Sequence, residues 1–142
     1  MRILGIDAGE RTLGLALSDP AGILASPLQT IRRSGEAKDL AALEQVIAEH
    51  EVGEIVVGLP LNMNGSRGPQ AQKAEALAKL LRERFQVPVH LWDERLSTVA
   101  AERAMLEADL SRQKRKKAID QVAAAFFLQG FLEAHGRKEE AR

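Results

Sequence analysis

The sequence contains no cysteine, which excludes disulfide bonds, thiolate zinc sites, iron–sulfur clusters and cysteine nucleophiles together. It also has no surplus of charge, because 20 lysine and arginine residues balance 20 aspartate and glutamate residues. No uncharged run exceeds twelve residues, which is too short to span a bilayer. We therefore expect a cytoplasmic protein with no signal peptide, no membrane anchor and no membrane partner.

Charge is nevertheless uneven along the chain. The segment RQKRKK, Arg112 to Lys117, carries five positive charges in six residues, whereas the acidic residues are spread thinly. We expect this basic segment in a loop and at the start of the last helix, either as a solvated stretch or as a phosphate-binding patch. The length of 142 residues suits one domain, of which only about residues 137–142 are expected to fray.

The N-terminal part of the chain has the pattern of a three-stranded meander. Residues 2–7 form an apolar run, residues 12–18 alternate leucines with small residues, and a third strand is expected near residues 25–31. The tight loop around Gly9 predicts that the first two strands are antiparallel. Pro27 predicts that the third strand lies at an edge of the sheet or begins there.

The rest of the chain alternates helices with strands. Apolar residues at helical spacing predict helices from after Gly35 to about Glu51, from Pro69 to Phe85, from about Thr98 to Glu107, and after the basic segment to about His135, with Gly136 as the stop. Apolar runs predict buried strands at residues 54–60 and 87–94. The order β-β-β-α-β-α-β-α-α predicts an α/β fold with a five-stranded mixed sheet flanked by helices.

Acidic residues stand at the ends of two predicted strands and in the last helix. Asp7 ends the first strand, and Asp93 and Glu94 end the last one. Asp120 falls on the apolar stripe of the final helix, four residues before Ala124. Strand ends beside a change of direction form the usual ligand crevice of such sheets. We therefore expect the three positions to converge in one cleft.

Converged carboxylates repel one another unless protons or cations neutralise them. Oxygen ligands without cysteine or paired histidines favour Mg²⁺ or Mn²⁺ over zinc. Two such ions about 4 Å apart activate a water and stabilise the leaving oxygen of a phosphodiester. Each acid also has an ordinary interpretation, because an acid at a strand end is commonly solvated and an aspartate early in a helix complements the helix dipole.

Three blocks of the sequence together resemble one family. They are GIDAGERTLGLALSD at residues 5–19, VVGLPLNMNGSRGPQA at 56–71 followed by WDERLST at 92–98, and SRQKRKKAIDQVAAAFFLQ at 111–129. Their order and spacing resemble the YqgF/RuvX family, the short bacterial members of the RuvC-like, ribonuclease H-fold nucleases. The resemblance implies one ribonuclease H-like (YqgF) nuclease domain over residues 1–142 and divalent-metal hydrolysis of nucleic acid. The implied activity is Holliday junction resolution in DNA recombination and repair, or maturation of the 5′ end of pre-16S rRNA in ribosome biogenesis.

The family pattern implies that Asp7, Glu94 and Asp120 are the catalytic residues and metal ligands. Asp93 is the rival of Glu94, because the offset of one residue places it on the opposite side of the strand. The larger RuvC resolvases carry a further acidic or histidine residue about one turn from the helix acid, whereas here lysine and alanine stand three positions before and after Asp120. Three acids are thus left for two Mg²⁺ or Mn²⁺ ions, and the second ion is expected to bind weakly.

Candidate contacts with nucleic acid surround these acids, in the loop of residues 58–71, beside Glu94 and in the basic segment. They are Arg11, Asn62, Asn64, Ser66, Arg67, Arg95, Thr98, Arg112, Lys114, Arg115, Lys116 and Lys117. The expected partner is branched DNA or precursor rRNA. Junction resolution needs two active sites related by a two-fold axis, so that substrate predicts a homodimer.

Two other functions fit parts of the pattern. A non-catalytic nucleic-acid-binding module would keep the fold and the basic segment while its acids are structural. A DxG loop between two strands also cradles phosphate in actin-like and sugar-kinase ATPases. Those enzymes need a duplicated domain, and 142 residues leave no room for it.

Overall fold

The computed structural model describes residues 1–96 and 112–140, with side chains over residues 1–95 and 121–135. One sheet contains the strands β1 (Arg2–Ala8), β2 (Thr12–Ser18), β3 (Ala25–Arg32), β4 (Val52–Leu59) and β5 (Val89–Asp93), in the order β3-β2-β1-β4-β5. The β1–β2 and β2–β3 pairs are antiparallel, whereas β1–β4 and β4–β5 are parallel. The mixed five-stranded sheet predicted from the sequence is confirmed.

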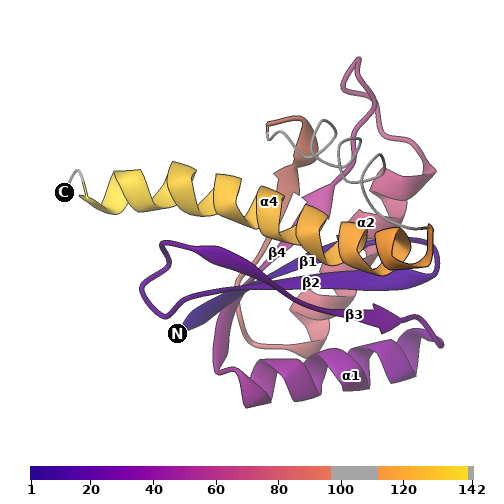
Figure 1. The fold of residues 1–142 in the computed structure, drawn as a ribbon, viewed down its shortest axis with the longest axis horizontal. Helices are drawn as coiled ribbons and strands as arrows, with labels where there is room; N and C mark the ends of the chain where they lie inside the picture. The colour runs from indigo at the N-terminus through magenta and orange to yellow at the C-terminus, as the bar shows by residue number, and fades with distance from the viewer. Residues whose placement is uncertain (97–111, 141–142) are drawn as a thin grey trace.

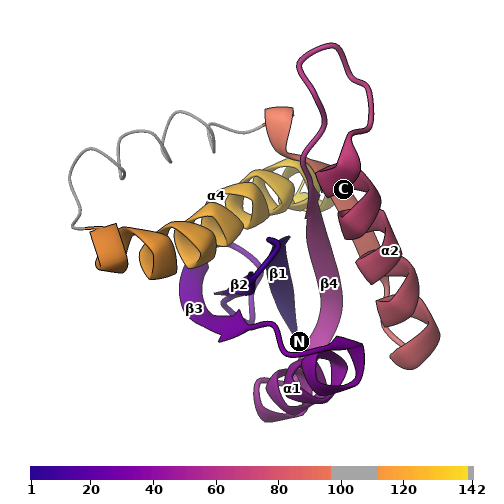
Figure 2. The ribbon, with the colours of Figure 1, turned by 90° about the vertical axis from the view of Figure 1, so that its right-hand side faces the viewer.

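The helices are α1 (Glu36–Glu49), α2 (Pro69–Arg84) and α4 (Arg112–Glu140), and the short 3₁₀ turn η1 (Glu94–Leu96) follows β5. Figures 1 and 2 show α4 across one face of the sheet and α1 with α2 against the other. The predicted helix from Thr98 to Glu107 lies outside the described residues. None of the helices in the described part of the chain combines the length and the apolarity that crossing a membrane requires.

The two faces of the sheet carry side chains of different size. Leu13 and Leu15 of β2 belong to the core beneath α1 and α2, whereas Ala16 packs toward α4. In β1, a β-carbon at Gly5 would lie 3.1 Å from Leu128 Cβ and 3.3 Å from the carbonyl oxygen of Ala124. Small residues on this face therefore let α4 approach the sheet closely.

Helix α4 runs in the direction opposite to β1. Its later residues, including Phe131 and His135, line a groove together with Met1 to Ile3 at the start of β1. Its earlier residues Ala124 and Leu128 lie against Gly5, farther along the same strand. The turns of α4 before Ala124 therefore lie toward the end of β1 where Asp7 stands (Figure 1).

Some predicted boundaries are wrong. Helix α4 continues through Gly136 to Glu140, because one glycine inside a helix costs only about 1 kcal/mol when its neighbours favour the helix. The basic segment is helical along its whole length, without the predicted loop. Strand β5 ends at Asp93 and Glu94 opens η1, so Glu94 is not a strand residue. Fraying from residue 137 stays a prediction.

The prediction for Pro27 is confirmed. Strand β3 lies at an edge of the sheet, and Pro27 pairs with Ala16 beside a shift in register. An edge position suits proline because it has no N–H to donate to a neighbouring strand.

Candidate active site

The carboxylate of Glu94 lies over the end of β4. A β-carbon at Gly58 would stand 2.7 Å from Glu94 Oε1 and 2.7 Å from Phe127 Cε2, so no other residue fits there without displacing them. Glu94 Oε1 is itself buried. Gly58 thus provides the space that the Glu94 carboxylate occupies. We did not predict this role from the sequence, although a glycine inside a strand pattern is the usual sign of a close approach.

The neighbouring carboxylate of Asp93 is engaged elsewhere. Arg95 donates to it from Nη2 over 2.8 Å, from Nε over 3.1 Å and from its backbone N–H over 2.9 Å. These bonds, chiefly those of the side chain, hold the pKa of Asp93 below its ordinary value. Asp93 pairs with Leu59, which packs on the core beneath α1 and α2. Asp93 and Glu94 therefore have different neighbours, Arg95 for the first and the space over Gly58 for the second.

Asp7 is partly buried near the end of β1. It lies two residues after Gly5, and alternation along a strand gives both residues the same face, the one that α4 covers. Gly5 pairs with Val56 and Ile6 with Val57, so the same register brings Asp7 level with Gly58. Neighbouring strands lie about 4.8 Å apart. The Glu94 carboxylate over Gly58 is therefore about one strand spacing from β1.

Asp120 is placed by the backbone of α4 alone. It precedes Ala124 by one helical turn, about 6 Å along the axis, and Asp7 follows Gly5 by two residues, about 6.6 Å along the strand. The two offsets are nearly equal. Since Ala124 lies against Gly5 and α4 runs opposite to β1, the backbone of Asp120 lies toward Asp7. The Asp120 side chain lies outside those described, and among the described side chains no three histidine, aspartate or glutamate residues gather into a metal site.

The loop between β4 and α2 projects from the rest of the molecule (Figures 1 and 2). Its predicted nucleic-acid contacts bind one another: Asn62 Nδ2 donates to Ser66 Oγ over 2.9 Å, and Ser66 Oγ donates to Asn64 Oδ1 over 2.6 Å. Arg67 donates to Glu75 over 2.6 Å. These side chains therefore bond within the molecule, where the sequence had suggested contacts with a partner.

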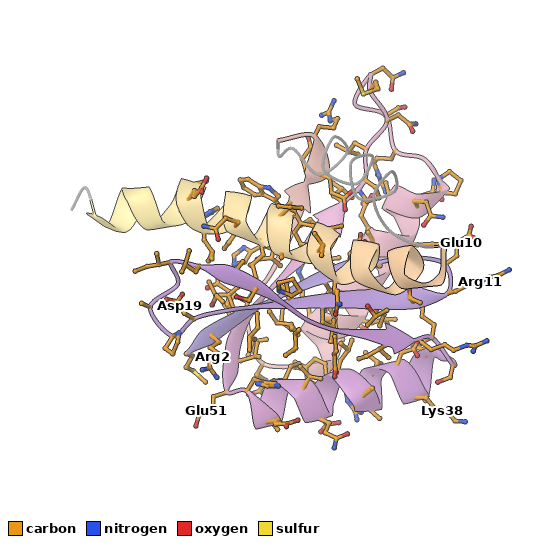
Figure 3. All side chains as sticks on the ribbon, in the orientation of Figure 1. Arg2, Glu10, Arg11, Asp19, Lys38 and Glu51 are labelled. Carbon is orange, nitrogen blue, oxygen red and sulfur yellow. The ribbon has the colours of Figure 1, made fainter. Side chains whose placement is uncertain are left out.

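Two of the remaining predicted contacts, Arg95 and Arg11, have described side chains. Arg95 reaches from Asp93 to the carbonyl oxygen of Met63, over 3.4 Å, and so ties the loop to η1. Arg11 is exposed in the turn between β1 and β2 (Figure 3). The backbone of the basic segment forms the first turns of α4, and Thr98 lies outside the described residues.

Comparison with known proteins identifies the chain's relatives. The RuvX family, described as Holliday junction resolvase, matches residues 1–134. A protein from Moorella thermoacetica is 56% identical over 137 residues, covering 96% of this chain and 98% of its own length, and one from Clostridium botulinum strain Hall is 54% identical over 134 residues, covering 94% and 98%. Both carry the name "Putative pre-16S rRNA nuclease".

A solved structure shares the fold. RuvC of T. thermophilus, determined in complex with a Holliday junction substrate, superposes with a TM-score of 0.56 at 18% identity and covers 95% of each chain. This likeness supports the ribonuclease H-like architecture of the five-stranded sheet and its helices. The family match over residues 1–134 and the relatives at 54% and 56% identity show that the chain belongs to the RuvX family of nucleases.

Proposed function

We propose that the chain is a divalent-metal-dependent nuclease whose Asp7, Glu94 and Asp120 hold the metal ions. The observation that carries this proposal is the Glu94 carboxylate over Gly58, where a β-carbon would come within 2.7 Å of it. The space above Gly58 lies on the same face of the sheet as Asp7. The first turns of α4, which include Asp120, lie toward the same end of the sheet. Acids from three distant parts of the sequence would then share one site.

The donors fit Mg²⁺ or Mn²⁺, since all three ligands are carboxylate oxygens. Bound metal would supply an activated water and charge stabilisation for the leaving oxygen of a phosphodiester. Asp7 lies in β1 and Glu94 in the turn η1 directly after β5, so both candidate ligands come from the end of the sheet. Three acids support two ions unequally, so one ion binds tightly and the second weakly.

The names of the relatives favour precursor 16S rRNA as the substrate. The relatives at 54% and 56% identity share a name that refers to it, and cleavage at its 5′ end would place the enzyme in the cytoplasm. A four-way DNA junction is the second candidate, since the family is described as Holliday junction resolvase. That substrate requires a homodimer with two sites, whereas trimming of rRNA needs only one.

The basic segment would hold the phosphates next to the metal site. Its five cationic side chains belong to the first turns of α4, and the positive end of the helix dipole adds to them. If about four phosphates are neutralised, the logarithm of the affinity falls with the logarithm of salt concentration with a slope of about −3 to −4. Fluorescence anisotropy of labelled RNA at several salt concentrations measures this slope.

The decisive experiment compares cleavage of precursor 16S rRNA and of four-way DNA junctions, each with Mg²⁺ and with Mn²⁺. Asp120→Asn, purified in parallel, controls for contaminating nucleases. We expect metal-dependent cleavage by the wild-type protein and none by the variant, with binding retained. Equal cleavage by both proteins would refute the assignment. Binding without cleavage by either would identify a non-catalytic nucleic-acid-binding module.

A further inference from the structure

Arg33 binds the turn that follows Asp7. Arg33 donates from Nη1 to the carbonyl oxygen of Gly9 over 2.9 Å, and its backbone N–H donates to the carbonyl oxygen of Arg11 over 2.8 Å. These two bonds hold the turn between β1 and β2 at Gly9 and at Arg11. Within the turn, the N–H of Gly9 donates to the carbonyl oxygen of Thr12 over 2.9 Å.

Arg33 is in turn held by Asp39. Asp39 is the only charged residue among those buried in the described part of the chain, at 4% exposure. Its Oδ2 accepts from Arg33 Nε over 3.4 Å, and its Oδ1 accepts from the N–H of Ser34 over 2.9 Å. One carboxylate therefore fixes both the side chain of Arg33 and the backbone that follows it.

Other support for the turn comes from the antiparallel pairing of β1 with β2, where Ala8 pairs with Leu13, and from exposed side chains. A groove of about 430 Å³, lined by Glu10, Asp39 and Lys73 among others, lies beside the turn in place of packed side chains. On this side Glu10 meets Gln70 over 3.2 Å and Lys73 over 3.7 Å. Exposed contacts of this kind contribute about 0–1 kcal/mol. Arg33 thus adds to the strand pairing a contact that is anchored to a buried carboxylate, unlike the exposed contacts of Glu10.

We infer that the Arg33–Asp39 pair positions Asp7, through the turn that begins two residues after it, and so tunes the affinity of the metal site. This role rests on the proposed function. Stability alone would not require the pair, since a buried ion pair is often no more stabilising than apolar side chains of similar volume. Residues that orient metal ligands commonly change metal affinity or activity by about 10–100-fold when they are replaced.

Metal binding can be measured without cleavage. Trp92 is the only tryptophan and stands two residues before Glu94, so quenching of its fluorescence by Mn²⁺ reports on occupancy. We expect Asp39→Asn to raise the Mn²⁺ concentration at half-saturation about tenfold. The amide that replaces the carboxylate carries no charge and would hold the guanidinium of Arg33 less firmly. Hydrogen exchange at the Gly9 amide should accelerate in parallel.

Arg33→Lys separates positioning from a simple ion pair. Lysine can neutralise Asp39, but its single ammonium cannot reproduce the fork that reaches Asp39 and Gly9 together. We therefore expect Arg33→Lys to weaken Mn²⁺ binding as much as Asp39→Asn does. Restoration of wild-type metal binding by lysine would overturn the positioning role.

Asp19→Asn is the matched control. Asp19 also holds a loop, by accepting the N–H groups of Ile23 over 2.7 Å and Leu24 over 3.0 Å, and it lies at the end of the molecule opposite Glu10 and Arg11 (Figure 3). We expect the Mn²⁺ concentration at half-saturation of Asp19→Asn to stay within about twofold of the wild-type value. This is far below the tenfold change expected for a positioning residue. An equal shift in this control, or a loss of thermal stability in Asp39→Asn with wild-type metal binding, would overturn the inference. A wild-type protein that binds no Mn²⁺ refutes the proposed function itself, before any variant is compared.

Discussion

At one end of the sheet Asp7 and Glu94 stand on either side of Gly58, whereas at the other end aromatic rings fill the space between α4 and the strands. There Phe131 stacks on His135 with ring centroids 4.0 Å apart and lies 5.2 Å from His90. Gln129 adds bonds to the β2–β3 loop at Ala25 N–H and the Ile23 carbonyl oxygen, over 2.8 and 2.9 Å. The same helix is thus fastened by packing at one end and borders acids at the other.

This difference shows that the two ends of α4 have different neighbours, aromatic rings at one end and acids at the other. The rings and amide contacts fix the position of α4 over the sheet. The earlier turns of the helix then lie toward the strand ends, where the proposed site would bring Asp120 to the acids of the sheet. Changes at the two ends should therefore have separable effects, on stability at one end and on cleavage at the other.

The largest expected effect is at the acidic end. Glu94→Gln should lower the rate of cleavage about a thousandfold or more, since it removes the charge of a proposed metal ligand. Asp93→Asn, one residue away, should retain most activity because its carboxylate bonds to Arg95. Single-turnover cleavage assays compare the two variants. Greater loss in Asp93→Asn would reverse the roles of the neighbouring acids.

The aromatic end should respond in stability. Phe131 is 3% exposed, and Phe131→Ala should lower the free energy of unfolding by about 3–5 kcal/mol. The cleavage rate per folded molecule should stay near that of wild type at low temperature. Urea denaturation followed by circular dichroism gives the first quantity. A catalytic loss as large as that of Glu94→Gln would show that the two ends are not separable.

Gly58→Ala should affect both properties, since its methyl group would meet Glu94 Oε1 and Phe127. We expect a loss of about 1–3 kcal/mol in stability from overpacking and about tenfold or more in activity. Gly68→Ala is the matched control, because a β-carbon there would come no closer than 3.6 Å to a neighbouring atom. If Gly58→Ala behaved like this control, Glu94 would have room to lie elsewhere.

The smallest expected effect concerns the Asp93–Arg95 pair and pH. The pKa of Asp93 is lowered by Arg95, so the pair stabilises the fold above the ordinary pKa of 3.8 and this contribution is lost as pH falls through the lower, folded-state value. The partly exposed pair should contribute about 0.2–1 kcal/mol. The difference in unfolding free energy between wild type and Asp93→Asn should shrink toward zero at low pH. A difference that grows on acidification would contradict the lowered pKa.

The sequence predicted the sheet well because β2 alternates large and small side chains and β4 is a continuous apolar run. Leu13 and Leu15 are buried in the core beneath α1 and α2, and the alternation alone indicates which face they share. Asp7 and Glu94 became candidates because both stand where a strand pattern ends, and their role in a metal site stays a prediction. Their common location follows from the parallel pairing of β1, β4 and β5.

Other features depend on contacts between residues far apart in the sequence. Gly58 makes room for Glu94, 36 positions later in the sequence, and no local pattern specifies which side chain fills a glycine's space. Asp39 falls within an ordinary amphipathic helix, so its burial against Arg33 is visible only in the fold. From the sequence alone, the polar side chains of residues 62–66 look available to bind another molecule. In the structure they bond one another.

Anomalous diffraction from crystals grown with Mn²⁺ tests most directly whether the three acids share cations. We predict a peak about 2.0–2.3 Å from carboxylate oxygens of Asp7, Glu94 and Asp120, with a second, weaker peak beside it. Strong peaks elsewhere on the protein, or an Asp120 carboxylate directed away from the other two in metal-soaked crystals, would contradict the shared site.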